Sequence, residues 1–155
     1  MKVLKEQVLQ SVNEVMAQMF YLLPDVDDLG QQVQKGDISG ETESVSLEIS
    51  EQQTLRFEYQ TELIALMTSH LTALPTEEVP RDWIRQMPLE ATEVCWAHYL
   101  NTHDKNSELL LGTPYRSEDA SERSKTPQWK VTFQSENYRL RIALLEFSSN
   151  VPDRK

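Results

Sequence analysis

The sequence predicts an α+β fold, in which a long N-terminal helix and two or three further helices pack on one largely antiparallel sheet. Three observations predict it: an apolar stripe of helical spacing near the start, two pairs of segments that alternate polar and apolar residues, and helical spacing between those pairs. With 155 residues the chain can form one domain core but not two ordinary ones. We expect one domain over residues 1–148 and a frayed tail over 149–155.

The first helix is expected from Lys2 to Leu23. Its apolar residues recur every three or four positions and therefore form one stripe. Pro24 should end the helix, because proline has no amide hydrogen and its ring clashes with the preceding turn. Residues 25–43 are rich in Asp, Gln and Gly and show no period, which predicts a loop or a partly paired edge. The stripe consists of Val8, Val12, Val15, Met19 and Leu22.

Two hairpins are expected in the sheet. Residues 44–50 (SVSLEIS) and 54–59 (TLRFEY) alternate polar and apolar side chains and are separated by a short connection. Residues 129–133 (WKVTF) and 138–147 (YRLRIALLEF) flank the turn sequence QSEN. Alternation of this kind is typical of antiparallel strands that bury one face.

Helical spacing returns twice between the two hairpins. Residues 61–74 carry leucines and a methionine at intervals of three and four, and Pro75 should end that helix. A second helical region extends from about Asp82 to Thr102. Pro88 lies inside it, and we expect the helix to break there, so that Pro88 opens a new helix.

The region after these helices predicts one more strand and a loop. Residues 107–111 (SELLL) are apolar enough for a short buried strand that ends near Gly112 and Pro114. Residues 114–127 (PYRSEDASERSKTP) are polar and predict a mobile loop.

The charge of the chain excludes several classes of partner. Twenty-five acidic and fifteen basic residues give a formal charge of −10, which repels nucleic acid and anionic lipid surfaces. No long apolar run is present, so we expect neither a secretory signal nor a membrane span, and a cytoplasmic location. The single cysteine, Cys95, cannot form an internal disulfide and is expected as a small core side chain.

The sequence contains no convincing metal or cofactor site. His70 lies on a different predicted helix from His98 and His103, whose spacing does not align them on one helical face. We expect His70 and His103 near helix ends, where imidazole can meet free carbonyl groups. No glycine-rich phosphate loop, nucleophile elbow or Cys/His pair at motif spacing occurs. We therefore expect no bound metal and no cofactor.

Residues 88–100 (PLEATEVCWAHYL) place Glu90 and Glu93 one helical turn apart, and LLGTPY follows with Pro114. In this order of elements the chain resembles the chemotaxis phosphatase family of CheX, CheC and FliY, and within it the CheX-like branch. Members of that family share a helix with a Glu-x-x-Asn pair and a later strand that ends in Leu-x-x-Pro. The resemblance extends to residues 36–40 (GDISG), before the first hairpin, and to residues 138–147 (YRLRIALLEF). It covers most of residues 1–147.

The resemblance implies a specific reaction and a specific partner. CheX-like proteins remove the phosphoryl group from the aspartate of a phosphorylated, CheY-like receiver domain, and the receiver supplies the magnesium. The helix glutamate engages a receiver lysine, while the asparagine amide orients the attacking water. Positioning does most of the work in such phosphoryl transfers.

This chain departs from the family motif at the asparagine. If Glu90 is the motif glutamate, the asparagine position holds Glu93, and an ionised carboxylate cannot donate a hydrogen bond. Two unit charges about 4 Å apart also repel by about 4 kcal/mol at an effective dielectric near 20. If Glu93 is the motif glutamate, Trp96 takes the amide position. The leading hypothesis is therefore a receiver-binding signalling protein of a chemotaxis or two-component pathway, with phosphatase activity lost or weakened.

Other interpretations of the same residues stay open. Structurally, Glu90 would meet free amides in the first turn of a helix that starts at Pro88, and Glu93 would pair with a cation of a neighbouring helix. An active phosphatase requires Glu93 to be held neutral by Glu90 and burial, or a residue of GDISG to handle the water. A third hypothesis is a structural homodimer joined through a sheet edge, with residues 138–147 as the joining strand. Trp83, Trp96 and Trp129 are expected in the core or at its rim.

Overall fold

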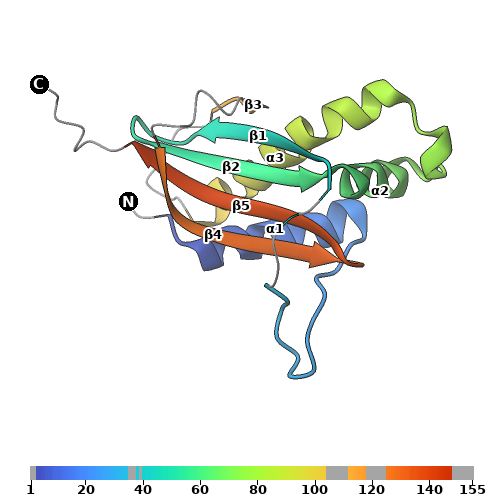
Figure 1. Ribbon diagram of the computed structural model, residues 1–155, viewed down its shortest axis with the longest axis horizontal. Helices are drawn as coiled ribbons and strands as arrows, with labels where there is room; N and C mark the ends of the chain where they lie inside the picture. Colours follow the sequence, from blue (N-terminus) through green and yellow to red (C-terminus); the bar gives the residue numbers. More distant parts are fainter. Residues whose placement is uncertain (1–2, 35–37, 39, 104–111, 118–124, 148–155) are drawn as a thin grey trace, which may run out of the picture.

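The computed structural model describes residues 3–34, 38, 40–103, 112–117 and 125–147. Three helices lie on one side of a five-stranded sheet and leave its other face open (Figure 1). The strand order is β3-β1-β2-β5-β4, and every neighbouring pair is antiparallel. This arrangement confirms the predicted α+β fold. The elements are α1 (Lys5–Phe20), β1 (Thr42–Glu48), β2 (Gln53–Gln60), α2 (Thr61–Thr72), the short 3-10 helix η1 (Thr76–Glu78), α3 (Arg81–His103), β3 (Tyr115–Arg116), β4 (Lys125–Ser135) and β5 (Tyr138–Phe147).

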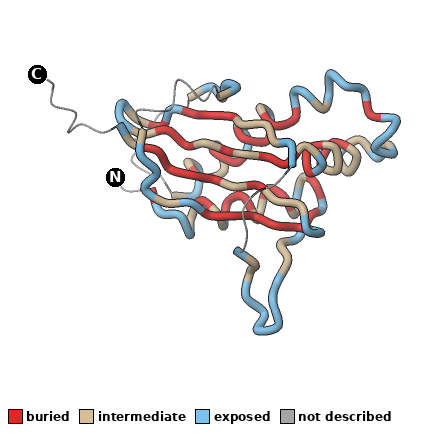
Figure 2. The backbone as a smooth tube through the Cα atoms, in the orientation of Figure 1, coloured by how far each residue is buried: buried red, intermediate tan, exposed pale blue. Residues whose placement is uncertain are grey.

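The core lies between the helices and the inner face of the sheet (Figure 2). Alternate residues of each long strand point into it, and the apolar stripe of α1 covers them from the other side. Burying one such side chain contributes about 1.5–3 kcal/mol. None of the described helices is long and apolar enough to cross a membrane. The fully buried sheet residues include Val45, Leu47, Leu55, Phe57, Tyr59, Phe133, Leu140 and Ile142.

Helix α1 is shorter than predicted at both ends. It ends at Phe20 because Tyr21 adopts a left-handed conformation with φ 58°, and the amide of Leu22 donates to the Met16 carbonyl at 3.0 Å. This closure is a common C-terminal cap, so the helix stops before Pro24 is reached. The chain stops being helical through a local turn and not through the proline.

The loop after α1 lies along the edge of β4. Within it, Val26 forms an isolated bridge with Gln32, which confirms partial pairing. The Asp25 amide donates to the Gln134 carbonyl at 2.7 Å, and the Thr132 amide donates to the Gln34 side chain at 3.0 Å. These contacts occupy backbone groups of an edge strand that would otherwise be open to pairing.

The expected break at Pro88 does not occur. Helix α3 is continuous from Arg81 to His103, with Pro88 inside it and buried. A proline within a helix costs about 3 kcal/mol, since the carbonyl four residues earlier loses its donor. Burial on both sides of the proline, by Met87 before it and by Ala91 after it, offsets that cost. Tertiary packing therefore overrides the local signal.

The strand expected over residues 107–111 lies outside the described residues. The loop expected over residues 114–127 needs correction, because β3 (Tyr115–Arg116) lies within it. The other end of that segment, from Lys125, belongs to β4, which has a register irregularity between Pro127 and Trp129.

The hypothesis of a homodimer joined through residues 138–147 required this strand to lie at an edge of the sheet, and it does not. Strand β5 pairs with both β2 and β4, so it is central and cannot offer a free edge. The edges of the sheet are β3 and β4.

Asp25, in the loop after α1, contacts the β4–β5 turn, and these contacts provide a test of how that loop stabilises the sheet. Burial raises the pKa of Asp25, but its hydrogen bonds from the Gln134 side chain and from the Glu136 and Asn137 amides outweigh burial and hold that pKa below 3.8. Because the folded pKa is depressed, the carboxylate stabilises the fold above its unfolded pKa, and this stabilisation is lost as the pH falls through the folded pKa. We expect Asp25→Ala to lower the free energy of unfolding by about 1 kcal/mol at pH 7.

Urea unfolding at pH 7 and in the acid range measures this difference, which should shrink on acidification. Asp28→Ala is the control, since Asp28 is exposed and makes no hydrogen bond or ion pair with a described residue. Equal stability of wild type and Asp25→Ala at pH 7 would contradict the assignment.

Candidate functional site

Glu90 and Glu93 both lie on the exposed side of α3. Their spacing places them on neighbouring positions of one helical face. Neither carboxylate forms a hydrogen bond or an ion pair with any described residue. Two acidic side chains are thus presented to solvent from the middle of a long helix.

Both structural explanations of this pair fail within the described part of the chain. Since α3 begins at Arg81, Glu90 lies beyond the first turn and cannot reach the free amides of the helix start. The predicted salt bridge of Glu93 to a neighbouring helix is absent among the described residues. Glu93 is also exposed and does not lie at the core boundary.

Glu90 borders a hollow between α2 and α3, which we call the α2–α3 hollow. It has a volume of about 330 Å³. Two large apolar side chains there are exposed, Leu71 at 42% and Trp83 at 49%. Val94, one helical turn beyond Glu90, is a third exposed apolar residue. The lining consists of Thr68, Leu71, Thr72, Trp83, Gln86, Met87 and Glu90.

The sequence located the glutamates but not this hollow. Trp83 was expected in the core or at its rim, and Leu71 was placed in the apolar stripe of its helix. The hollow arises because two helices that are separated in sequence by η1 lie side by side. Exposed apolar side chains that gather in one hollow are a feature of interaction surfaces.

The opposite side of α3 is fixed to the sheet. The hydroxyl groups of Tyr59 and Thr92 share a hydrogen bond of 2.8 Å in the core. Trp96 stacks on Tyr99 with ring centres 5.1 Å apart. Burial raises the pKa of the Cys95 thiol to about 12, so this cysteine stays protonated and is a core side chain, as predicted. The exposed face of the helix is therefore held in a defined orientation.

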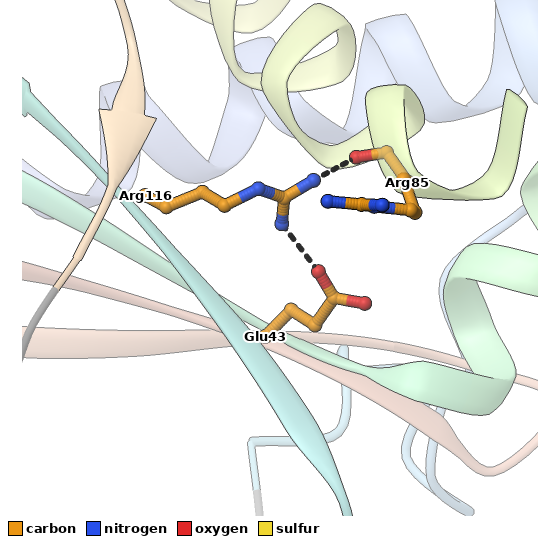
Figure 3. Close-up of polar contacts among 3 residues, drawn as sticks. All are labelled: Glu43, Arg85 and Arg116. Carbon is orange, nitrogen blue, oxygen red and sulfur yellow. Dashed lines mark hydrogen bonds and ion pairs between the residues drawn. The ribbon is translucent and has the colours of Figure 1, made fainter. Parts of the chain in front are cut away.

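The segment that carries Pro114 lies beside the same helix. Its Gly112 packs so closely on β1 that an added Cβ would lie 2.7 Å from the Glu48 carbonyl oxygen. Beyond it, Arg116 donates to the Glu43 carboxylate at 2.5 Å and to the Arg85 carbonyl of α3 (Figure 3). Arg116 thus ties the edge strand to α3 within one turn of Pro88. Most of GDISG, by contrast, lies outside the described residues.

The histidines do not form a metal site. His70 Nδ1 lies 2.8 Å from the Phe20 carbonyl at the end of α1, and His98 Nε2 lies 3.2 Å from Glu14. His103 is the last residue of α3, and its ring lies against Tyr99. Across the described residues, no three His, Cys, Asp or Glu side chains are grouped as metal ligands.

The Arg116 link can be tested directly. We expect Arg116→Ala to increase amide exchange in α3 around Pro88, because Arg116 donates to the Arg85 carbonyl, three residues before the proline, and so holds this part of the helix to the edge strand. Global stability should fall by less than about 1 kcal/mol, since the Arg116–Glu43 pair is partly exposed. Hydrogen exchange followed by mass spectrometry measures the effect.

Arg81→Ala is the control for this experiment. Arg81 lies at the start of the same helix, is exposed and has no polar partner among the described residues. Unchanged exchange in Arg116→Ala would show that the link does not hold the helix.

Comparison with known proteins identifies the fold. No family model and no curated protein matches the sequence. The structure is similar to the chemotaxis protein CheX from Vibrio vulnificus, with a TM-score of 0.62 and 11% identity over 91% of this chain and 94% of that one. A CheC-like superfamily protein from Shewanella sp. PV-4 has a TM-score of 0.61 and 16% identity over 90% and 94%.

A chain of the CheX–CheY–BeF3–Mg²⁺ complex from Borrelia burgdorferi is similar as well. Its TM-score is 0.60 at 12% identity, over 90% of this chain and 95% of that one. These likenesses extend over nearly the whole length of each protein, and they bear out the fold that the order of sequence elements indicated. The chain therefore has the fold of the CheX and CheC-like chemotaxis proteins.

Proposed function

We propose that the protein belongs to the CheX-like branch and binds the receiver domain of a CheY-like response regulator in the cytoplasm. The observation that carries the proposal is Glu90, an exposed carboxylate with no described partner, at the border of an apolar hollow. A chain of the same fold occurs in a complex with CheY. The protein then acts in chemotaxis or two-component signalling.

The α2–α3 hollow supports a protein partner. Trp83 and Leu71 offer apolar area that would be removed from water on binding, and tryptophan is enriched among residues that dominate interface energies. Glu90 adds a charge that can pair with a lysine of the partner once water is excluded. The hollow therefore combines an apolar anchor and one charged contact.

We propose that phosphatase activity is lost or weakened. Glu93 occupies the position at which the family motif has an amide, and its exposed carboxylate offers only acceptor oxygens when ionised. It would also face the anionic phosphoryl group, at a cost of about 4 kcal/mol for charges about 4 Å apart at an effective dielectric near 20. Binding survives this substitution, because Glu90 and the apolar residues do not depend on Glu93.

A binding experiment tests the first part. Receiver domains from the same genome are titrated with the protein, with and without BeF3⁻ and Mg²⁺, by isothermal calorimetry. Glu90→Ala should weaken the dissociation constant by about tenfold, or about 1.4 kcal/mol. Trp83→Ala should weaken it at least as much. Glu62→Ala is the matched control, since this exposed glutamate of α2 is not part of the hollow.

Failure of all receivers to bind, or equal effects of Glu62→Ala and Glu90→Ala, would overturn the proposed function.

Glu93→Asn tests the second part, because it restores the Glu-x-x-Asn pair with Glu90. We expect the variant to accelerate the decay of a phosphorylated receiver by about tenfold or more over wild type, since an oriented donor replaces a repelling charge. Decay of the ³²P-labelled receiver measures it, and Glu93→Gln controls for removal of charge alone. Rapid decay already with wild type, abolished by Glu90→Ala, would show that the protein is an active phosphatase.

A further inference from the structure

The open face of the sheet differs in charge from the rest of the chain. Neighbouring side chains of a strand alternate between the two faces, so residues between core positions point away from the helices. Although the chain has a formal charge of −10, five of its described basic residues occupy this face. They are Arg56, Lys125, Lys130, Arg139 and Arg141.

Two of these cations border a cavity at the edge of β4. The cavity has a volume of about 480 Å³, which is within the range of small-molecule sites. Lys130 and Arg141 reach it from the sheet, and Lys5 reaches it from the first turn of α1. Among the lining residues that the structure describes, Glu6 is the one acid, so their formal charge is positive. We call this space the edge cavity.

The cations of the edge cavity are poorly compensated. Lys5 and Lys130 form no hydrogen bond or ion pair with any described residue. Arg141 has an ion pair with Glu58, but the Nε–Oε1 distance is 3.8 Å, and its buried Nε has no acceptor. The Lys5 and Lys130 ammonium groups and the Arg141 guanidinium repel one another where they border one cavity, and an anion bound between them would lower that cost.

A second, smaller hollow extends the positive region over the sheet. It has a volume of about 120 Å³, shares Lys130 and Arg141 with the edge cavity and adds Arg56 and Glu58. The edge cavity also has an apolar part, formed by Leu9 and Val131. A ligand that fits both features carries a compact dianionic group and a small apolar group.

We propose that the edge cavity binds a small organic phosphate. Phosphate monoesters carry a charge between −1.5 and −2 at neutral pH, which complements two lysines and one arginine whose acidic neighbours are Glu6 in the lining and Glu58 beside Arg141. The guanidinium of Arg141 can meet two phosphate oxygens, whereas the lysines act as point charges. Leu9 and Val131 accommodate the organic part. This site is separate from the α2–α3 hollow and does not depend on receiver binding.

An NMR titration of the ¹⁵N-labelled chain with phenyl phosphate tests the site, with benzoate as a monoanionic comparison. We expect saturable shifts of amides around Leu9, Lys130 and Thr132, weaker shifts with benzoate, and affinity that falls as salt is added. Lys130→Ala should weaken phenyl phosphate binding by about tenfold. Arg141→Lys keeps the positive charge but removes the planar guanidinium that can donate to two phosphate oxygens, so it should also weaken binding.

Lys125→Ala is the matched control. Lys125 lies on the same strand and face, but its ammonium group donates to Thr54 and lies 5.0 Å from the centre of the Phe147 ring, outside both hollows. It should bind phenyl phosphate as wild type does. No saturable shifts, or equal weakening by Lys125→Ala and Lys130→Ala, would overturn the proposal. Glu90→Ala should leave these shifts unchanged, which separates this site from the proposed function.

Discussion

The attachment of α3 to the core is the interaction on which the arrangement of the α2–α3 hollow depends. A row of buried side chains, from Met87 to Tyr99, fills the space between this helix and the strands, and the Thr92–Tyr59 hydrogen bond fixes its rotation. Because that row continues on both sides of Pro88, the helix stays continuous despite the lost backbone hydrogen bond. The same rotation presents Glu90 to solvent beside α2.

The two faces of the molecule have different chemistry. The helical side presents Glu90, which has no polar partner among the described residues, beside exposed apolar side chains. The open face of the sheet gathers cations around Arg141, which suits a small anion. The net charge of −10 does not reveal this difference between the two faces, because a sum over the chain contains no information about position.

The fold is kept although few residues are shared with proteins of similar structure. Identities of 11–16% accompany TM-scores of about 0.6 over nearly the full length. Cores tolerate extensive exchange of apolar residues when volume and pattern are retained, so alternation and helical spacing outlast identity. A polar functional position is less tolerant, because an ionised carboxylate cannot donate the hydrogen bond that an amide donates.

The sequence alone determined the class of fold, both hairpins, the course of α2 and the core position of Cys95, because hydrophobic periodicity is a local property. It also singled out Glu90 and Glu93 through their spacing. Only the tertiary structure decided that α3 runs through Pro88, that β5 is central, and that Trp83 and Leu71 stand beside Glu90. Each of these results depends on contacts between residues far apart in the chain, whose energies outweigh the local preferences that a sequence displays.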